Sequence, residues 1–163
     1  MKKFNDFLVL VLSKLCFVLM VIFTILVAVQ VFSRYVFNSP TTWTELVARY
    51  LFVWTILLYM PVVYRQQANP SFTLFHEKLS QKALKYVDTI ITIVVLFTAI
   101  YMTYWGTVMC QKMANKYIMG LNIHANIPMN LVYSSIPVGG FFLAFMCVET
   151  LLNLILKKEA DHA

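Results

Sequence analysis

The stretch LCFVLMVIFTILVAVQVFS, residues 15–33, runs without a charged residue between Lys14 and Arg34. A transmembrane helix needs roughly 20 mostly apolar residues, so this run is long enough to cross a bilayer. It is too long for the hydrophobic region of a typical signal peptide, and no small-x-small cleavage site follows it before Arg34. We therefore interpret it as an uncleaved first transmembrane span.

Three further apolar runs follow, separated by charged residues. The second is short between Arg49 and Arg65, so it must extend back to Trp43 to cross a bilayer. Four spans and their connections use up the 163 residues, which leaves no room for a soluble domain. The sequence predicts an all-α integral membrane protein, with a single membrane domain over residues 1–163 and spans over about residues 10–34, 43–65, 87–111 and 126–156.

The composition is typical of a protein that is embedded in a lipid bilayer. The chain is 61% hydrophobic and 12% charged, whereas soluble domains are about half apolar and about a quarter charged. The net charge of +6 comes mainly from basic residues beside the apolar runs, where they favour headgroup contacts with phospholipids over nucleic-acid binding. The cysteines all lie in apolar runs without a CxxC pair and are interpreted as small buried hydrophobic residues: Cys16, Cys110 and Cys147.

The lysines and arginines also predict the orientation of the chain. With four spans, both termini and the second connection share one side of the membrane, and the first and third connections share the other. The first side carries nine basic residues and the second carries four, which favours both termini in the cytoplasm. The nine are Lys2, Lys3, Lys14, Arg65, Lys78, Lys82, Lys85, Lys157 and Lys158, and the four are Arg34, Arg49, Lys112 and Lys116.

The second connection has a helical pattern of its own, over about residues 71–86. Apolar residues recur there at helical spacing with lysines on an adjacent face, and Pro70 and Ser71 suit a helix start. A basic amphipathic helix of this kind lies in the membrane interface. The alternative is a plain extension of the third span. The residues that form the pattern are Phe72, Phe75, Lys78, Leu79, Lys82 and Lys85.

Catalytic and cofactor sites are not expected. The three histidines, His76, His124 and His162, fall in separate connections or in the tail, so none can ligate haem from within a span. The HExxH, GxSxG and phosphate-binding glycine motifs are absent from the sequence. We therefore predict no catalytic residue, cofactor or metal in this chain, and no enzymatic activity.

A polar cluster surrounds the first connection, formed by Arg34, Trp43, Glu45 and Arg49. Glu45 and Arg49 are four residues apart on the second span, so they can pair on one helix face. We interpret the cluster as a structural ion pair flanked by interfacial aromatic residues. The alternative is a proton- or substrate-handling glutamate, as in small multidrug exporters.

The fourth span carries small residues suited to close helix packing. Gly139, Gly140 and Ala144 form a small-residue face that permits contact within the bundle or with a partner. Pro61 and Pro137 lie inside apolar spans, where each frees a backbone carbonyl and can kink its helix.

The first connection and the ends of the spans beside it also resemble a known protein family in sequence. The segments VFSRYVFNSP (31–40), WTEL (43–46) and ARYLFVW (48–54) resemble the small membrane subunit, the DctQ-type small permease, of TRAP (tripartite ATP-independent periplasmic) transporters. A weaker likeness covers the entry to the fourth span, at Gly120, Ile127, Pro128, Tyr133, Pro137 and Gly139. The sequence departs from the family at Leu46, where a second acid is common, and over residues 68–72, where a histidine is common.

The resemblance implies a non-catalytic role in transport. In such systems a periplasmic binding protein captures a carboxylate-bearing solute, and a large membrane subunit moves it with a sodium-driven elevator motion. The small subunit would brace the scaffold of the large one and offer surface to the binding protein, while sodium would bind in the large subunit. Candidate contacts for the binding protein, chosen by predicted topology, are Arg34, Asn38, Lys112, Lys116, Asn122 and Asn126.

Two rival functions remain open on the sequence alone. One is a self-sufficient small proton-coupled exporter that uses Glu45. The other is a bare membrane anchor subunit for a redox or assembly complex. The sequence carries no information on which solute would be moved.

Overall fold

The structure is a computed structural model that describes residues 2–36, 42–66, 81–118 and 128–160. It is built from the helices α1 (Lys2–Val36), α2 (Thr42–Arg65), α4 (Gln81–Lys112), α5 (Asn130–Tyr133) and α6 (Ser135–Ala160). The segments Asn5–Val36, Trp43–Arg65, Tyr86–Lys112 and Asn130–Leu152 are long and apolar enough to cross a membrane. The predicted all-α fold with four transmembrane helices is therefore confirmed.

The predicted interfacial helix falls largely outside the described residues, which omit 67–80. Phe72, Phe75, Lys78 and Leu79 belong to that segment. Lys82 and Lys85 belong to α4, which runs from Gln81 as one helix into the third span. The interfacial helix therefore stays a prediction.

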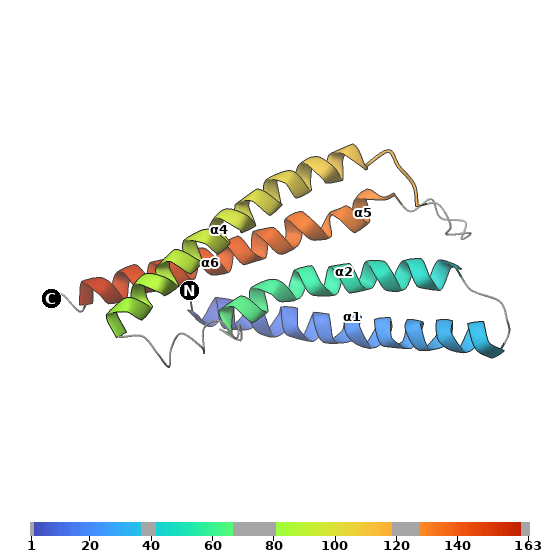
Figure 1. The fold of residues 1–163 in the computed structure, drawn as a ribbon, viewed down its shortest axis with the longest axis horizontal. Helices are drawn as coiled ribbons and strands as arrows, with labels where there is room; N and C mark the ends of the chain where they lie inside the picture. The colour runs from blue at the N-terminus through green and yellow to red at the C-terminus, as the bar shows by residue number, and fades with distance from the viewer. Residues whose placement is uncertain (1, 37–41, 67–80, 119–127, 161–163) are drawn as a thin grey trace.

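The helices form two antiparallel pairs, α1 with α2 and α4 with α6, and α2 joins the pairs by packing on α6. Figure 1 shows the start of α1 and the end of α6 at the same end of the bundle. We call this the predicted cytoplasmic end, and the opposite end the predicted periplasmic end. The two pairs lie close at the predicted cytoplasmic end and diverge toward the other (Figure 1).

Glycines allow α6 to pack closely against α2 and α4. A Cβ on Gly139 would lie 2.6 Å from the carbonyl oxygen of Leu57 on α2, and one on Gly140 would lie 2.6 Å from Oγ1 of Thr103 on α4. Gly106 of α4 faces α6 in the same way, since its Cβ would lie 2.8 Å from Pro137 Cδ. Close packing of this kind holds helices together in lipid, where apolar surface alone gives little drive to associate. The small-residue face predicted on α6 thus lies inside the bundle.

Two apolar clusters complete the core. One joins α2, α4 and α6 through Tyr64, Ala99, Leu143, Met146 and Cys147. The other joins α1 and α2 through Leu12, Cys16, Leu58 and Val62. Cys16 and Cys147 are buried free thiols, as predicted, and the half-buried thiol of Cys110 donates to the carbonyl oxygen of Asn130 at 3.5 Å.

Candidate functional site

Arg65, the last residue of α2, connects three helices at the predicted cytoplasmic end. Its Nη2 donates to Oδ1 of Asp6 on α1 at 2.6 Å, and its Nη1 donates to Oε2 of Glu149 on α6. The Arg65 side chain is 21% exposed and that of Glu149 only 6%. A buried carboxylate needs a paired, hydrogen-bonding cation, and the planar guanidinium can serve two carboxylates at once.

The preceding residue, Tyr64, makes the link to the fourth helix. Its hydroxyl donates to Oγ1 of Thr92 on α4 at 3.0 Å, and the Thr92 hydroxyl donates to the carbonyl oxygen of Asp88 at 2.7 Å. Two consecutive residues at the end of α2 therefore bind α1, α4 and α6. We call Asp6, Tyr64, Arg65, Thr92 and Glu149 the polar junction.

Further polar atoms are buried at this end of the bundle. Asn5, beside Asp6 on α1, is almost fully buried, and neither polar atom of its amide has a hydrogen-bond partner among the described residues. The second carboxylate oxygen of Glu149, Oε1, is also buried, and no residue in the described part of the chain donates to it. Burying such groups costs about 1–3 kcal/mol each.

The polar cluster predicted at the first connection is assembled only in part. Nη2 of Arg49 donates to Oε1 of Glu45 at 2.9 Å, on the same face of α2. Both side chains are more than half exposed, at 63% and 52%. Arg34 and Trp43 are also exposed, and none of the three ion pairs among the described residues includes Arg34.

A groove of about 720 Å³ opens at the predicted periplasmic end, between α2 and the segment that follows α4. The backbone N–H of Met129 donates to the carbonyl oxygen of Lys116 at 2.7 Å, which holds the two sides of the external segment together. The residues that line the groove are Tyr50, Met113, Asn115, Lys116, Tyr117, Ile118, Met129 and Tyr133.

The structure describes three of the candidate binding-protein contacts. Lys116 lines it, Lys112 is exposed at the end of α4, and Arg34 is exposed near the end of α1. Asn38, Asn122 and Asn126 lie outside the described residues. The three cations lie at the predicted periplasmic end, on α1, α4 and the segment after α4, and Lys116 is the one that lines the groove.

Polar side chains within the described spans bond mostly to their own helices. The hydroxyls of Thr24, Thr98, Thr103 and Thr107 each donate to the carbonyl oxygen four residues earlier. The described part of the chain contains no group of three or more His, Cys, Asp or Glu residues that could hold a metal ion. These hydroxyls therefore do not converge on one another to form a midplane site.

Sequence reasoning missed the polar junction, because Arg65 was counted only as an orientation signal. Glu149 carried the available signal, since it is an acid that directly follows the fourth apolar run. Intramembrane acids are usually paired with a cation. Its partner is 84 residues away along the chain, so spacing alone could not identify it.

Comparison with known proteins places the chain in a family. Residues 23–157 match the family model described as tripartite ATP-independent periplasmic transporters, DctQ component. The chain is 29% identical to the sialic acid TRAP transporter small permease protein SiaQ of Vibrio cholerae, over 77% of this chain and 70% of that protein. It is 26% identical to a putative TRAP transporter small permease protein of Haemophilus influenzae, over 95% of this chain and 94% of that protein.

A third relative is a longer protein. The chain is 25% identical to the sialic acid TRAP transporter permease protein SiaT of Haemophilus influenzae, over 78% of this chain but only 20% of that protein. A segment similar to this chain is therefore joined there to a much larger permease, which supports a large membrane subunit as the partner of this chain. The chain belongs to the DctQ family of tripartite ATP-independent periplasmic transporter small permeases, and is thus a multi-pass inner-membrane component of a transporter and not an enzyme.

Proposed function

We propose that the chain is the non-catalytic small permease subunit of a sodium-coupled secondary transporter, which imports a carboxylate-bearing solute delivered by a periplasmic binding protein. The observation that carries this proposal is the match to one fifth of a longer sialic acid permease. In that relative the remaining four fifths of the polypeptide are available to bind sodium and move the solute. Sialic acid is itself a carboxylate, which supports the proposed substrate class.

The arrangement of polar groups supports a bracing role for this chain. Binding and moving a solute needs polar groups that converge on a site within the membrane. The ion pairs of the polar junction instead connect helices of the bundle at its predicted cytoplasmic end. We place the sodium and solute sites in the large subunit, whose scaffold this chain stabilises.

Exposed cations at the predicted periplasmic end support docking of the binding protein. Arg34 and Lys112 are exposed there, and Lys116 lines the open groove. Exposed charges act mainly on the rate of encounter between two proteins and on their relative orientation. This role requires both chain termini to lie in the cytoplasm, as the distribution of lysine and arginine predicts.

Charge reversal at Arg34 tests the docking role. In cells that express the whole transporter, Arg34→Glu should reduce uptake while the amount of the chain in the membrane stays the same. Arg34→Gln, which removes the charge without reversing it, should reduce uptake less. Unchanged uptake by Arg34→Glu would remove Arg34 from the docking surface.

The rival exporter needs a glutamate that binds and releases protons near the middle of the membrane. Glu45 lies in the first turn of α2, and its carboxylate pairs with Arg49 on the same helix. This position and pairing disfavour the rival. The exporter predicts loss of transport in Glu45→Gln, whereas the proposed function predicts that Glu45→Gln retains uptake by the assembled transporter.

A further inference from the structure

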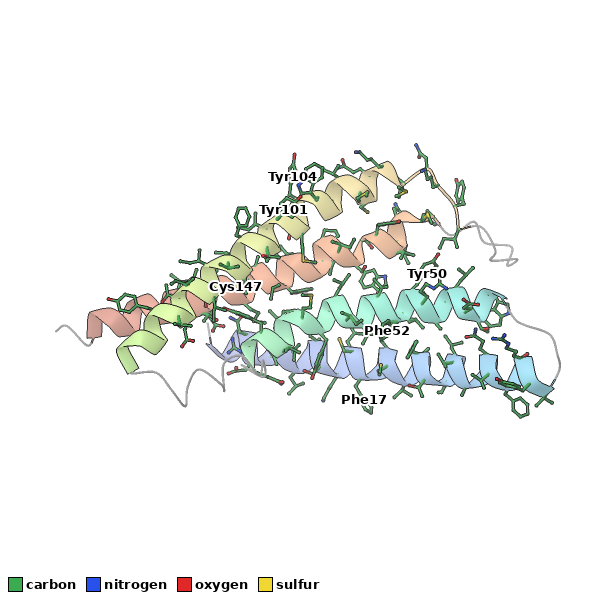
Figure 2. All side chains as sticks on the ribbon, viewed as in Figure 1. Phe17, Tyr50, Phe52, Tyr101, Tyr104 and Cys147 are labelled. Atoms are coloured by element: carbon green, nitrogen blue, oxygen red, sulfur yellow. The ribbon has the colours of Figure 1, made fainter. Side chains whose placement is uncertain are left out.

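An aromatic patch lies on the exposed face of α4. It consists of Phe97, Tyr101, Tyr104 and Trp105, which are 72%, 56%, 64% and 47% exposed. The rings of Tyr101 and Trp105 are 6.1 Å apart between centroids, and those of Tyr104 and Trp105 are 5.7 Å apart and edge-on. Figure 2 shows Tyr101 and Tyr104 pointing away from the rest of the bundle.

The opposite face of α4 holds the helix in the bundle. Ala99 is fully buried there, and Thr103 and Gly106 lie against α6. These residues alternate with the patch at helical spacing, because 3.6 residues make one turn. The patch therefore points outward for the same reason that Ala99 and Gly106 point inward.

The patch lies deep in the hydrocarbon region. The charge-free part of α4 runs between Asp88 and Lys112, so its midpoint is Ile100. At about 1.5 Å of rise per residue, Tyr101 and Tyr104 start about 1.5 and 6 Å from that midpoint, well within a half-thickness of about 15 Å. Helical side chains also lean toward the helix N-terminus, which brings the Tyr104 ring still closer to the midplane.

This depth is unusual for tyrosine and tryptophan on a lipid-facing surface. Their polar groups favour the headgroup level, where they can reach water. Among the described residues the structure gives no hydrogen bond made by the hydroxyls of Tyr101 and Tyr104 or donated by the indole N–H of Trp105. Lipid tails cannot supply a partner at this depth.

The exposed face of α1 makes a useful contrast. The charge-free part of α1 runs between Lys14 and Arg34, so its midpoint is residue 24. Its side chains at comparable depth, such as Val21 and Ile25, are 43% and 57% exposed but carry no hydrogen-bonding group. Such a face is satisfied by lipid tails alone. The exposed faces of α1 and α4 therefore differ in their hydrogen-bonding groups. The face of α1 suits contact with lipid tails, and the face of α4 suits contact with another protein.

We propose that the aromatic patch on α4 is the surface on which a transmembrane helix of the large permease subunit packs. This inference rests on the proposed function, because it assumes that the large subunit is the partner. The partner helix offers hydrogen-bond acceptors at midplane depth, such as hydroxyl, amide or freed carbonyl oxygens, to Tyr101, Tyr104 and Trp105. The exposed face of α1 contacts lipid.

Photocrosslinking in native membranes tests the surface directly. p-Benzoyl-phenylalanine replaces Tyr101 or Tyr104 on α4, or Ile25 on α1 as the control matched in depth and exposure, in cells that express the large subunit. Illumination should give an adduct of this chain with the large subunit from positions 101 and 104, and none from position 25. An adduct from position 25 alone, an adduct between two copies of this chain, or no protein adduct from the patch would each overturn the proposal.

Removing both tyrosine hydroxyls of the patch tests the hydrogen bonds. Tyr101→Phe with Tyr104→Phe keeps both rings, so the bundle should fold as before, and association with the large subunit in detergent should weaken about five- to tenfold. Tyr59→Phe on α2 removes an exposed hydroxyl outside the patch and should change association less than twofold. Equal effects of the two changes would contradict the proposal.

The outcomes also separate this inference from the proposed function. If the wild-type chain forms no complex with the large subunit, both fail. If the complex forms and its crosslinks arise from other positions, only the assignment of the α4 surface fails.

Discussion

Arg65 at the end of α2 donates through Nη1 to the buried carboxylate of Glu149 on α6, 84 residues later in the chain. The same guanidinium donates to Asp6 on α1 through Nη2 at 2.6 Å. Its neighbour Tyr64 reaches Thr92 on α4. The polar junction therefore fixes the relative positions of all four transmembrane helices at the predicted cytoplasmic end.

Removal of the Arg65 charge should strongly destabilise the bundle. Arg65→Gln leaves the Glu149 carboxylate buried without a cation, which in comparable sites costs about 3–5 kcal/mol. Denaturant unfolding in detergent micelles, followed by circular dichroism, measures the change. The double variant Arg65→Gln with Glu149→Gln should recover part of the loss, because the uncompensated buried charge is gone.

Arg49→Gln is the matched control for this prediction. It breaks another arginine–glutamate ion pair of α2, but one whose side chains are more than half exposed. Exposed pairs contribute about 0–1 kcal/mol. A loss of stability in Arg49→Gln as large as that in Arg65→Gln would contradict the role assigned to burial.

Alanine substitutions at the two adjacent glycines of α6 should destabilise the bundle to different extents. Gly139→Ala places its Cβ against the backbone of α2 at Leu57, whereas Gly140→Ala meets first the Thr103 side chain, which can rotate. Overpacking of this kind costs about 1–3 kcal/mol, and we expect Gly139→Ala to lie at the upper end and Gly140→Ala at the lower. Thermal unfolding of the purified chain measures both.

Val148→Ala serves as the control on the same helix, because Val148 is exposed. It should change the melting temperature least of the three variants. If Gly140→Ala destabilises the bundle more than Gly139→Ala, the close approach of α6 to α2 is not the tighter of the two contacts.

Loss of the Tyr64 hydroxyl should weaken the contact of α2 with α4. Tyr64→Phe removes a hydrogen bond of 3.0 Å but leaves the Thr92 hydroxyl bonded to the Asp88 carbonyl oxygen. The expected loss is about 0.5–1.5 kcal/mol in the free energy of unfolding. Tyr59→Phe, a change of the same atoms at an exposed position, should be neutral, and equal losses would argue against the interhelical bond.

Fusion proteins test the orientation. Alkaline phosphatase is active only after export, so a fusion after Met119 should be active and a fusion after Arg65 inactive. Reversed activities would place both termini outside the cytoplasm. In that case Arg34, Lys112 and Lys116 could not contact a periplasmic protein.

The architecture could be predicted from the sequence because lipid imposes strong constraints. A run such as residues 15–33 has few stable alternatives to a spanning helix, since every backbone polar group must be satisfied internally. The pairing of Glu45 with Arg49 was also predictable, because it depends only on spacing within one helix. Likewise, Gly139 and Gly140 indicated close packing before any partner helix was known.

The contacts between helices could not be predicted in the same way. The partners of Arg65 are set by how α1 and α6 lie in space, and no spacing rule connects residues 6, 65 and 149. The aromatic patch was missed for a related reason. Tyr101 and Tyr104 belong to an ordinary apolar run in sequence, and only the burial of Ala99 and Gly106 on the opposite face shows that the tyrosines point outward.

Transport by purified components in sealed vesicles tests the central claim most directly. Vesicles that contain this chain alone, with the periplasmic binding protein, its solute and an inward sodium gradient, should take up no solute. Uptake should appear only when the large membrane subunit is added. Sustained solute uptake by vesicles that contain this chain as the only membrane protein would contradict the account.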